Sequence, residues 1–334
     1  MKQRIAAMPK VSVMVLTYNH EAYIRKTLAS ILEQKTDFDF EIIVGDDAST
    51  DGTPNIIQEV YEKHPDKIVP FLHEKNLGGF GKANTLHALD RAKGIYIAPM
   101  DGDDYWTDPL KLQKQADLLD AEPGVVACFH NAEIVFEDGS FPNEFVNPPD
   151  QKVVTTVEDL IGEDEVWYMA TSAVMFRHGV IKEYPQWFHD SKSGDIPRYI
   201  LLGKHGGTFK YINETMSVYR KNRNGMSFTD SYHDEEFLLN RIGMYEGINQ
   251  ELNQKHEKTL KKNIGRYYKM LITSHQNVDK PLNRISYFLK YLANSQPSTK
   301  ELKETFRDDV LSQKWQNAYS QVALLPHKIK QKFS

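Results

Sequence analysis

The sequence predicts an α/β protein with a mainly parallel central sheet flanked by helices, followed by a helical C-terminal region. Between residues 11 and 121, short β-branched apolar runs alternate with segments whose apolar residues recur every three or four positions. Such alternation is typical of βαβ units, which have parallel strands and right-handed crossovers. Polar clusters follow three of these strands. From about residue 230 the composition favours helix instead.

The first half of the chain contains four expected strands, each followed by an expected helix. The strands lie at residues 11–16, 41–44, 68–72 and within 94–100, and the helices run near 21–34, from Pro54, near 82–93 and from Asp108 to before Pro123. Asn19 or His20 is expected to cap the first helix. Pro54 suits the first turn of the second helix, and Asp108-Pro109 is a start signal for the fourth.

Beyond residue 124 the expected elements are shorter. We expect a strand at 125–129, a hairpin around 134–140, a strand at 171–176, a helix at 198–203, two short strands at 209–212 and 216–220, and C-terminal helices broken near Pro281, Pro297 and Pro326. We therefore divide the chain into a sheet domain, 1–228, with halves of about 1–110 and 111–228, and a helical region, 229–334.

Composition excludes several classes of protein. A net charge of −5 gives no basic footprint for nucleic acid. A single cysteine, Cys128, rules out an internal disulfide framework and a Cys-cluster zinc site. The first ten residues lack the apolar core of a signal peptide, and no apolar stretch is long enough to span a bilayer. These features favour a cytoplasmic protein.

Three carboxylates within four positions follow the fourth strand, at Asp101, Asp103 and Asp104. Carboxylates this close repel one another unless a cation lies between them, and Mg²⁺ prefers carboxylate oxygen together with substrate phosphates. Taken alone, the segment is better explained as a solvated acidic turn. However, 17–19 and 46–47 also follow strands, and ligands bind beyond the carboxyl ends of parallel strands. This convergence favours a site.

The glycines at 78–81 do not form a phosphate loop. The segment lacks G-x-x-x-x-G-K-[ST], and no G-x-G-x-x-G follows the first strand. A P-loop ATPase and a Rossmann dehydrogenase are both disfavoured for this reason.

Taken together, these segments resemble the family 2 glycosyltransferases of the GT-A fold. The resemblance rests on residues 11–19 (VSVMVLTYN), 41–53 (EIIVGDDASTDGT), 76–84 and 94–106, and on Asp195 before a helix. Residues 104–109 look especially like those of bacterial members that build surface polysaccharides. The resemblance covers roughly the first two-thirds of the chain.

The resemblance implies a role for each matching residue. Mn²⁺ or Mg²⁺ would be held by Asp103 of the D-x-D motif, and Asp195 falls where the family places its catalytic base. Many relatives carry a His at the position that Asn222 occupies here. A His contribution to the metal site is therefore not expected in this chain. Donor nucleotide contacts are expected from Thr17, Tyr18, Asn19, Asp47, Ser49, Asp51, Lys82, Asp101 and Gly102.

Three residues are candidates for contact with the acceptor or the transferred sugar, each with an alternative. Trp106 could stack on a sugar ring or anchor its loop in the core. His130 could reach a substrate, although a satisfied buried histidine is the safer interpretation. Thr171 could line the acceptor site or pack at its rim.

The basic, partly apolar tail at 324–333 could touch an anionic membrane, although a solvated terminus is preferred.

The resemblance and the residues together predict a metal-dependent inverting glycosyltransferase, of hexosyl- or N-acetylhexosaminyltransferase type. One base opposite the leaving group gives a single displacement with inversion. We expect a nucleotide-sugar donor of the UDP-linked kind and a glycan or polyprenyl-linked acceptor. Peripheral membrane contact and a homo-oligomer formed through the C-terminal helices are further expectations. The alternatives are a sugar nucleotidyltransferase and an inactive nucleotide-sugar or glycan-binding protein.

Overall fold

The structure is a computed structural model that describes residues 8–78, 81–162, 168–221, 234–277 and 279–311. It divides into two compact units, one of Met1–His189 with Ser193–Phe228 and one of Asp190–Lys192 with Thr229–Ser334. Asn222 and Pro326, singled out above, lie outside the described residues. No helix in the described ranges has the length and apolar character needed to cross a bilayer.

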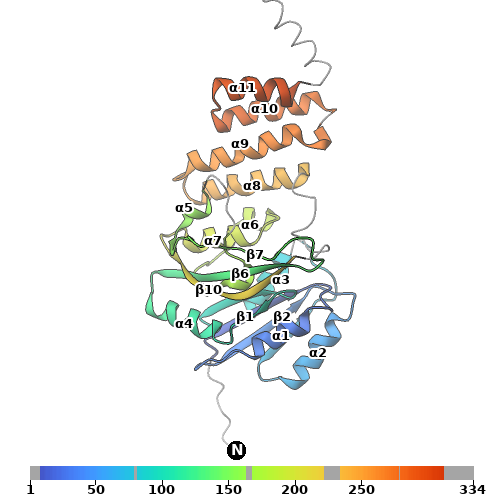
Figure 1. Cartoon of the computed structure of the whole chain (residues 1–334), viewed down its shortest axis with the longest axis vertical. Helices are drawn as coiled ribbons and strands as arrows, with labels where there is room; N and C mark the ends of the chain where they lie inside the picture. The colour runs from blue at the N-terminus through green and yellow to red at the C-terminus, as the bar shows by residue number, and fades with distance from the viewer. Residues whose placement is uncertain (1–7, 79–80, 163–167, 222–233, 278, 312–334) are drawn as a thin grey trace, which may run out of the picture. The chain divides into compact units, whose positions relative to one another are not determined.

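The described part of the first unit contains a single ten-stranded sheet (Figure 1). Its main path runs β3-β2-β1-β4-β9-β6-β10-β5, with β7 beside β6 and β8 beside β10. The strands are β1 (Val11–Thr17), β2 (Phe40–Asp46), β3 (Ile68–Leu72), β4 (Tyr96–Asp101), β5 (Tyr105–Trp106), β6 (Val125–Phe136), β7 (Glu144–Phe145), β8 (Val154–Thr155), β9 (Val174–Arg177) and β10 (Thr208–Lys221).

The sheet is parallel through β3, β2, β1 and β4, as the alternating pattern predicts. β9 runs antiparallel between β4 and β6, and β10 is again parallel to β6. The helices of this unit are α1 (Ile24–Leu32), α2 (Thr53–Lys63), α3 (Lys82–Arg91), α4 (Lys111–Ala121), α5 (Val157–Leu160), α6 (Gln186–Asp190, whose last residue belongs to the second unit) and α7 (Asp195–Gly203), with the 3-10 turn η2 (Thr171–Ala173).

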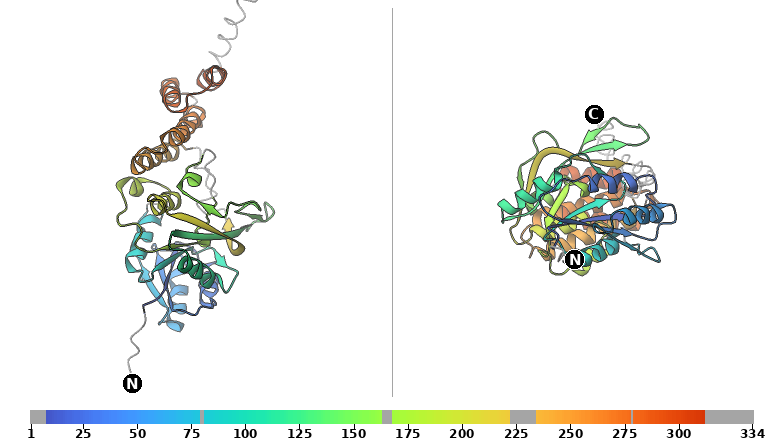
Figure 2. Two further views of the ribbon diagram at one scale, coloured as in Figure 1. Left: turned by 90° about the vertical axis from the view of Figure 1, so that its left-hand side faces the viewer. Right: turned by 90° about the horizontal axis from the view of Figure 1, so that it is seen from below.

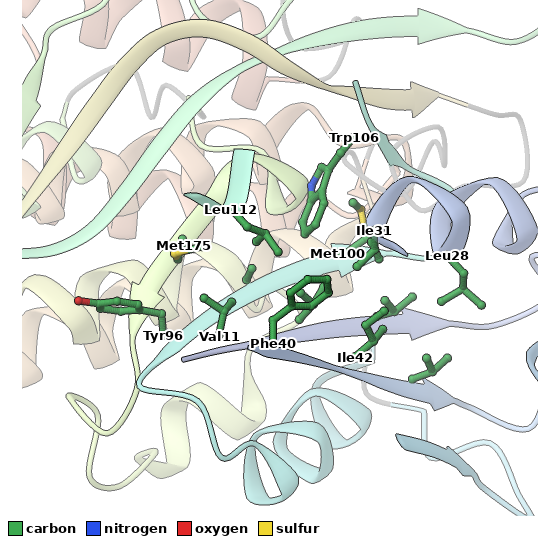
Figure 3. Packing of buried hydrophobic residues seen from close by; sticks show 14 of the residues in the cluster. Val11, Leu28, Ile31, Phe40, Ile42, Tyr96, Met100, Trp106, Leu112 and Met175 are labelled. Atoms are coloured by element: carbon green, nitrogen blue, oxygen red, sulfur yellow. The ribbon is translucent and has the colours of Figure 1, made fainter. Parts of the chain in front are cut away.

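Helices cover both faces of the parallel strands. Alternate residues of β1 and β2, such as Val11 and Ile42, pack with α1, α2 and α4 in one apolar cluster, which includes Leu28 and Leu112 (Figure 3). On the opposite face, Asn84 of α3 donates to the carbonyl of Gly45 at 2.9 Å. Figure 2 gives two further views of these layers. The two-sided covering explains why β1, β2 and β4 form nearly continuous apolar runs in the sequence.

Several sequence expectations need correction. Residues 171–173, expected to begin a strand, form the 3-10 turn η2, and β9 begins only at Val174. α1 begins at Ile24 without a side-chain cap, because Asn19 Oδ1 instead accepts from the backbone N–H of Thr50 at 2.8 Å. α4 begins at Lys111, and Asp108 accepts from the N–H of Leu110 before it. The two strands expected between 209 and 220 are one strand, β10, whose register shifts after Ile212 let it continue past the polar residues 213–214.

The described part of the second unit is helical. Its helices are α8 (Glu235–Glu251), α9 (Glu257–Thr273), α10 (Pro281–Ser295) and α11 (Thr299–Glu304), with the short turns η5 (His275–Asn277) and η6 (Thr305–Val310). Pro281 occupies the first turn of α10, and Pro297 lies between α10 and α11. The breaks expected at these prolines are therefore confirmed.

Candidate active site

The carboxyl ends of three parallel strands carry the candidate site. Thr17 of β1 is in register with Asp46 of β2, and Leu16 of β1 with Asp101 of β4. Backbone hydrogen bonds continue past the strand ends, from Asp47 N to Thr17 O at 3.0 Å and from Gly102 N to Leu16 O at 2.8 Å. The structure thus brings the three polar clusters together at one edge of the sheet.

The loop after β2 is shaped by its own polar side chains. Ser49 donates to Asp46 Oδ1 at 2.5 Å, and its oxygen accepts from the N–H of Asn19 at 2.8 Å. Asp51 accepts from the N–H groups of Glu21 and Thr53, both at 3.0 Å. These contacts tie the loop after β2 to the loop after β1, so Asn19, Ser49 and Asp51 fix the shape of this part of the edge.

Asp47 and Thr17 are buried where β2 and β1 end. Asp47 is 5% exposed, and its Oδ1 accepts from the N–H of Leu77 at 2.8 Å. Thr17 is 3% exposed, and its hydroxyl oxygen has no hydrogen-bond partner in the described part of the chain. Tyr18 beside it is 44% exposed. A buried hydroxyl without a partner beside an exposed aromatic ring is a suitable place for a polar ligand to bind.

Carboxylates gather at the end of β4. Burial, then the neighbouring carboxylates of Asp103 and Asp195, raise the pKa of Asp101 to about 7. Asp195, the first residue of α7, comes from far along the sequence and is tied to this edge by Thr171, whose hydroxyl donates to Asp195 Oδ2 at 3.1 Å. The structure therefore places Asp195 close to Asp101.

Arg198 balances part of this negative charge. Its Nη1 lies 3.4 Å from Asp195 Oδ1, one turn along α7. The side chain of Arg198 is almost fully buried, and its positive charge lowers the pKa of Asp101. Sequence reasoning assigned Arg198 no role. The one sequence feature that could have indicated a role is that Arg198 stands among the apolar residues of α7.

Asp104 differs from its neighbours because it is fully buried. Its Oδ1 accepts from the N–H of Arg220 at 2.9 Å, and burial, with Asp103 and Asp101 nearby, raises its pKa well above the usual range. Thr27 of α1 donates to the carbonyls of Gly102 at 2.9 Å and Asp104 at 2.6 Å. Asp104 therefore holds the turn in place.

Lys82 is held by the main chain. It is 5% exposed, and its ammonium donates to the carbonyls of Phe188 at 2.9 Å and His189 at 2.7 Å. A contact between Lys82 and a nucleotide would have to be made alongside these bonds or in exchange for them.

The structure favours the second of the two interpretations given for Trp106 and for His130, a place in the core rather than a sugar contact. Trp106 is 4% exposed, its indole N–H donates to Ser172 O at 2.9 Å, and the ammonium of Lys111 lies 3.9 Å from its ring centroid. His130 is fully buried, and burial lowers its pKa to about 3, so it is neutral. Both are core residues. Of the three candidates, only Thr171 lies at the carboxylate cluster.

The carboxylates suit a divalent cation that takes its other ligands from a substrate. Within the described residues, no group of three or more His, Cys, Asp or Glu side chains is arranged to hold a metal by itself. Mg²⁺ is usually bound through one or two carboxylates and substrate phosphates rather than in an all-protein cage. Burial and, after it, repulsion from Asp103 and Asp195 raise the pKa of Asp101, and a bound cation would relieve this repulsion. The residues present therefore fit the metal.

The sheet is mostly parallel, and polar loops after β1 and β2 meet a carboxylate cluster after β4 at its carboxyl edge. This arrangement is typical of glycosyltransferases with the GT-A fold. The profile described as "Glycosyl transferase family 2" matches residues 12–184, and the chain belongs to this family.

Three of the curated relatives that match the chain are bacterial. An uncharacterized protein of Mycobacterium tuberculosis is 36% identical over 226 residues, which are 66% of this chain and 62% of that protein, so the chain spans less than two-thirds of that relative's length. The putative teichuronic acid biosynthesis glycosyltransferase TuaG of Bacillus subtilis is 31% identical, covering 66% of this chain and 82% of TuaG. A Campylobacter jejuni GalNAc(5)-diNAcBac-PP-undecaprenol beta-1,3-glucosyltransferase is 26% identical, covering 79% and 82%.

Solved structures show the same fold. Residues 1–349 of Staphylococcus aureus TarS, crystallised with UDP-GlcNAc, superpose with a TM-score of 0.58 at 19% identity, covering 89% of this chain and 91% of that one. The fold class expected from the sequence, a GT-A-type α/β domain followed by helices, is confirmed.

Proposed function

We propose that this protein is a metal-dependent, inverting glycosyltransferase that moves a hexose or N-acetylhexosamine from a UDP-sugar to a glycan or lipid-linked acceptor in bacterial surface polysaccharide synthesis. Family membership and the names of TuaG and the undecaprenol-linked glucosyltransferase support this assignment. The observation that carries it is the approach of Asp195 to Asp101 at the carboxyl edge of the sheet.

Each part of the edge has a proposed task. The nucleoside is bound by Thr17, Tyr18 and Asp47, on a loop whose shape Asn19, Ser49 and Asp51 maintain. Asp101 and Gly102 lie against the ribose, and Asp103 ligates Mn²⁺ or Mg²⁺. The cation, when bound, supplies electrostatic stabilisation to the departing diphosphate.

Asp195 is the proposed base. It accepts the proton of the acceptor hydroxyl as that oxygen attacks the anomeric carbon from the face opposite the diphosphate. Thr171 and Arg198 hold the carboxylate in position through contacts of 3.1 and 3.4 Å. General-base catalysis of this kind contributes roughly 10²–10⁴-fold to a rate.

The test is Asp195→Asn in the full chain, with Asp117→Asn on the surface of α4 as the control. UDP release from UDP-glucose, UDP-galactose, UDP-GlcNAc and UDP-GalNAc is measured with Mn²⁺ or with EDTA, using polyprenyl-diphosphate-linked monosaccharides as acceptors. We expect Asp195→Asn to bind UDP normally and to lose at least about 100-fold in transfer. Near-normal transfer by this variant refutes the assignment of the base. Pyrophosphate release from UTP would instead indicate a nucleotidyltransferase, and no turnover at all a binding protein.

A further inference from the structure

We propose that Arg220 is a positioning residue that holds the Asp101–Asp104 turn in the shape that Asp103 needs to ligate the metal. This inference rests on the proposed function. Arg220 lies on β10, 117 positions along the chain from Asp103. Three sets of contacts carry the inference: those between Arg220 and the turn, those that fix Arg220 itself, and those that hold the other side of the turn.

Arg220 contacts the turn at two consecutive residues. Its side-chain Nη1 donates to the carbonyl of Asp103 at 2.5 Å. Its backbone N–H donates to the buried carboxylate of Asp104 at 2.9 Å. One contact depends on the guanidinium and the other on the strand, so only the first is lost when the side chain is changed.

The guanidinium of Arg220 is itself held on several sides. Its Nε lies 3.4 Å from Glu137 Oε1, and its side chain is 10% exposed. The ring of Tyr23 lies 5.1 Å from the guanidinium carbon and the ring of Tyr105 lies 4.7 Å from it. The hydroxyl of Tyr23 also donates to Glu137 Oε2 at 2.5 Å. An arginine fixed by an ion pair and two aromatic rings is already positioned to donate its hydrogen bond.

The opposite side of the turn is held by α1. Thr27 donates to the carbonyls of Gly102 and Asp104, the residues on either side of Asp103. The three consecutive carbonyls of the turn are therefore bonded alternately to α1 and to β10. Partners that orient a metal ligand in this way typically affect metal affinity by about 10–100-fold when they are removed.

The matched control is Arg177 of β9. Its guanidinium donates to the main-chain carbonyls of Leu119, Glu122 and Val125 and to the hydroxyl of Tyr96. Among the described residues it makes no contact with the Asp101–Asp104 turn. Arg177→Met and Arg220→Met both remove a structural guanidinium and keep an apolar stem. If Arg220 acted only through the stability of the fold, the two variants would show the same change in Mn²⁺ binding.

The experiment measures Mn²⁺ binding to the full chain at saturating UDP, from the paramagnetic resonance signal of free Mn²⁺, together with the thermal midpoint of unfolding. We expect Arg220→Met to weaken Mn²⁺ binding by about 10–100-fold. Arg220→Lys should recover part of this loss, and Glu137→Gln should weaken binding in the same direction by a smaller factor. Arg177→Met should lower the thermal midpoint and bind Mn²⁺ as the wild type does.

Wild-type-like Mn²⁺ binding by Arg220→Met, or an equal loss in Arg177→Met, overturns the positioning role. If Arg220→Met does not fold, unchanged binding in both Arg220→Lys and Glu137→Gln also overturns it. Failure of the proposed function is distinguishable, because the wild type would then show no Mn²⁺-dependent binding of UDP.

Discussion

Two lysines of the first unit are buried in different surroundings, and their ammonium groups have different consequences for the fold. Lys82 donates to two main-chain carbonyls. Lys111 is fully buried, and its ammonium lies over the ring of Trp106 without a hydrogen-bond acceptor in the described part of the chain. Burying a charge is costly unless it is paired or hydrogen-bonded, so Lys82 is expected to stabilise the fold and Lys111 to destabilise it at neutral pH.

Replacing Lys82 with Met should lower the free energy of unfolding by about 2–4 kcal/mol, because two carbonyls lose a charged donor. Denaturant unfolding measures this loss, and titration with UDP and Mn²⁺ measures ligand binding separately. Lys93→Met, at an exposed position, should change stability by less than about 0.5 kcal/mol. Weakened UDP binding with unchanged stability would instead place Lys82 on the nucleotide, as the family resemblance implies.

The stability contributed by Lys111 should depend on pH. Burial lowers its pKa from 10.5 to about 7 in the folded protein. Between these values the unfolded chain keeps a proton that the folded chain has lost, so raising the pH stabilises the fold. Lys111→Met should therefore be more stable than the wild type by about 2–4 kcal/mol near pH 6, and this difference should shrink near pH 9. Urea unfolding at both values checks this, and a difference that does not change with pH would contradict it.

At the scale of elements, the turn between β4 and β5 depends on a glycine packed against β1. A Cβ at Gly102 would lie 2.7 Å from His20 Nδ1 and 2.8 Å from Thr17 Cβ. Gly102→Ala should therefore push the turn away from β1, lowering the free energy of unfolding by about 1–3 kcal/mol and weakening UDP binding. The control is Gly124→Ala, where a Cβ meets nothing within 4 Å. Equal behaviour of the two variants in unfolding and UDP titration would rule this packing effect out.

The elements differ in how well the sequence predicted them. β1 and β2 are predictable because both faces of each strand are covered, which leaves continuous apolar runs. β10 was read as two strands because its polar residues 213–214 interrupt the pattern where the register shifts. The convergence of Asp47 and Asp101 could be predicted because both residues follow strands that were expected to be parallel. The contact between Arg220 and Asp103 could not be predicted, because a hydrogen bond spanning 117 positions leaves no local pattern.

The candidate site belongs entirely to the first of the two compact units. The residues proposed to bind the nucleotide and the metal come from β1, β2, β4 and their loops, with Asp195 from α7. The second unit has its own buried side chains, including Leu260 and Leu271 of α9 and Tyr245 of α8. Each unit thus has a core that can unfold separately, and a single two-state transition is not expected for the chain.

Ligand binding should therefore protect only the first unit. A ligand at 100 times its dissociation constant stabilises the state that binds it by about 2.7 kcal/mol, which slows hydrogen exchange through unfolding by roughly 100-fold. With UDP and Mn²⁺, peptides from β1, β2 and β4 should show this slowing, whereas peptides from α8, α9 and α10 should exchange as they do without ligand. Mass spectrometry of exchanged peptides measures both, and EDTA should reverse the protection. Equal slowing in α8–α10 would show that the two units unfold together, and the helical unit would then share the stability that the nucleotide supplies.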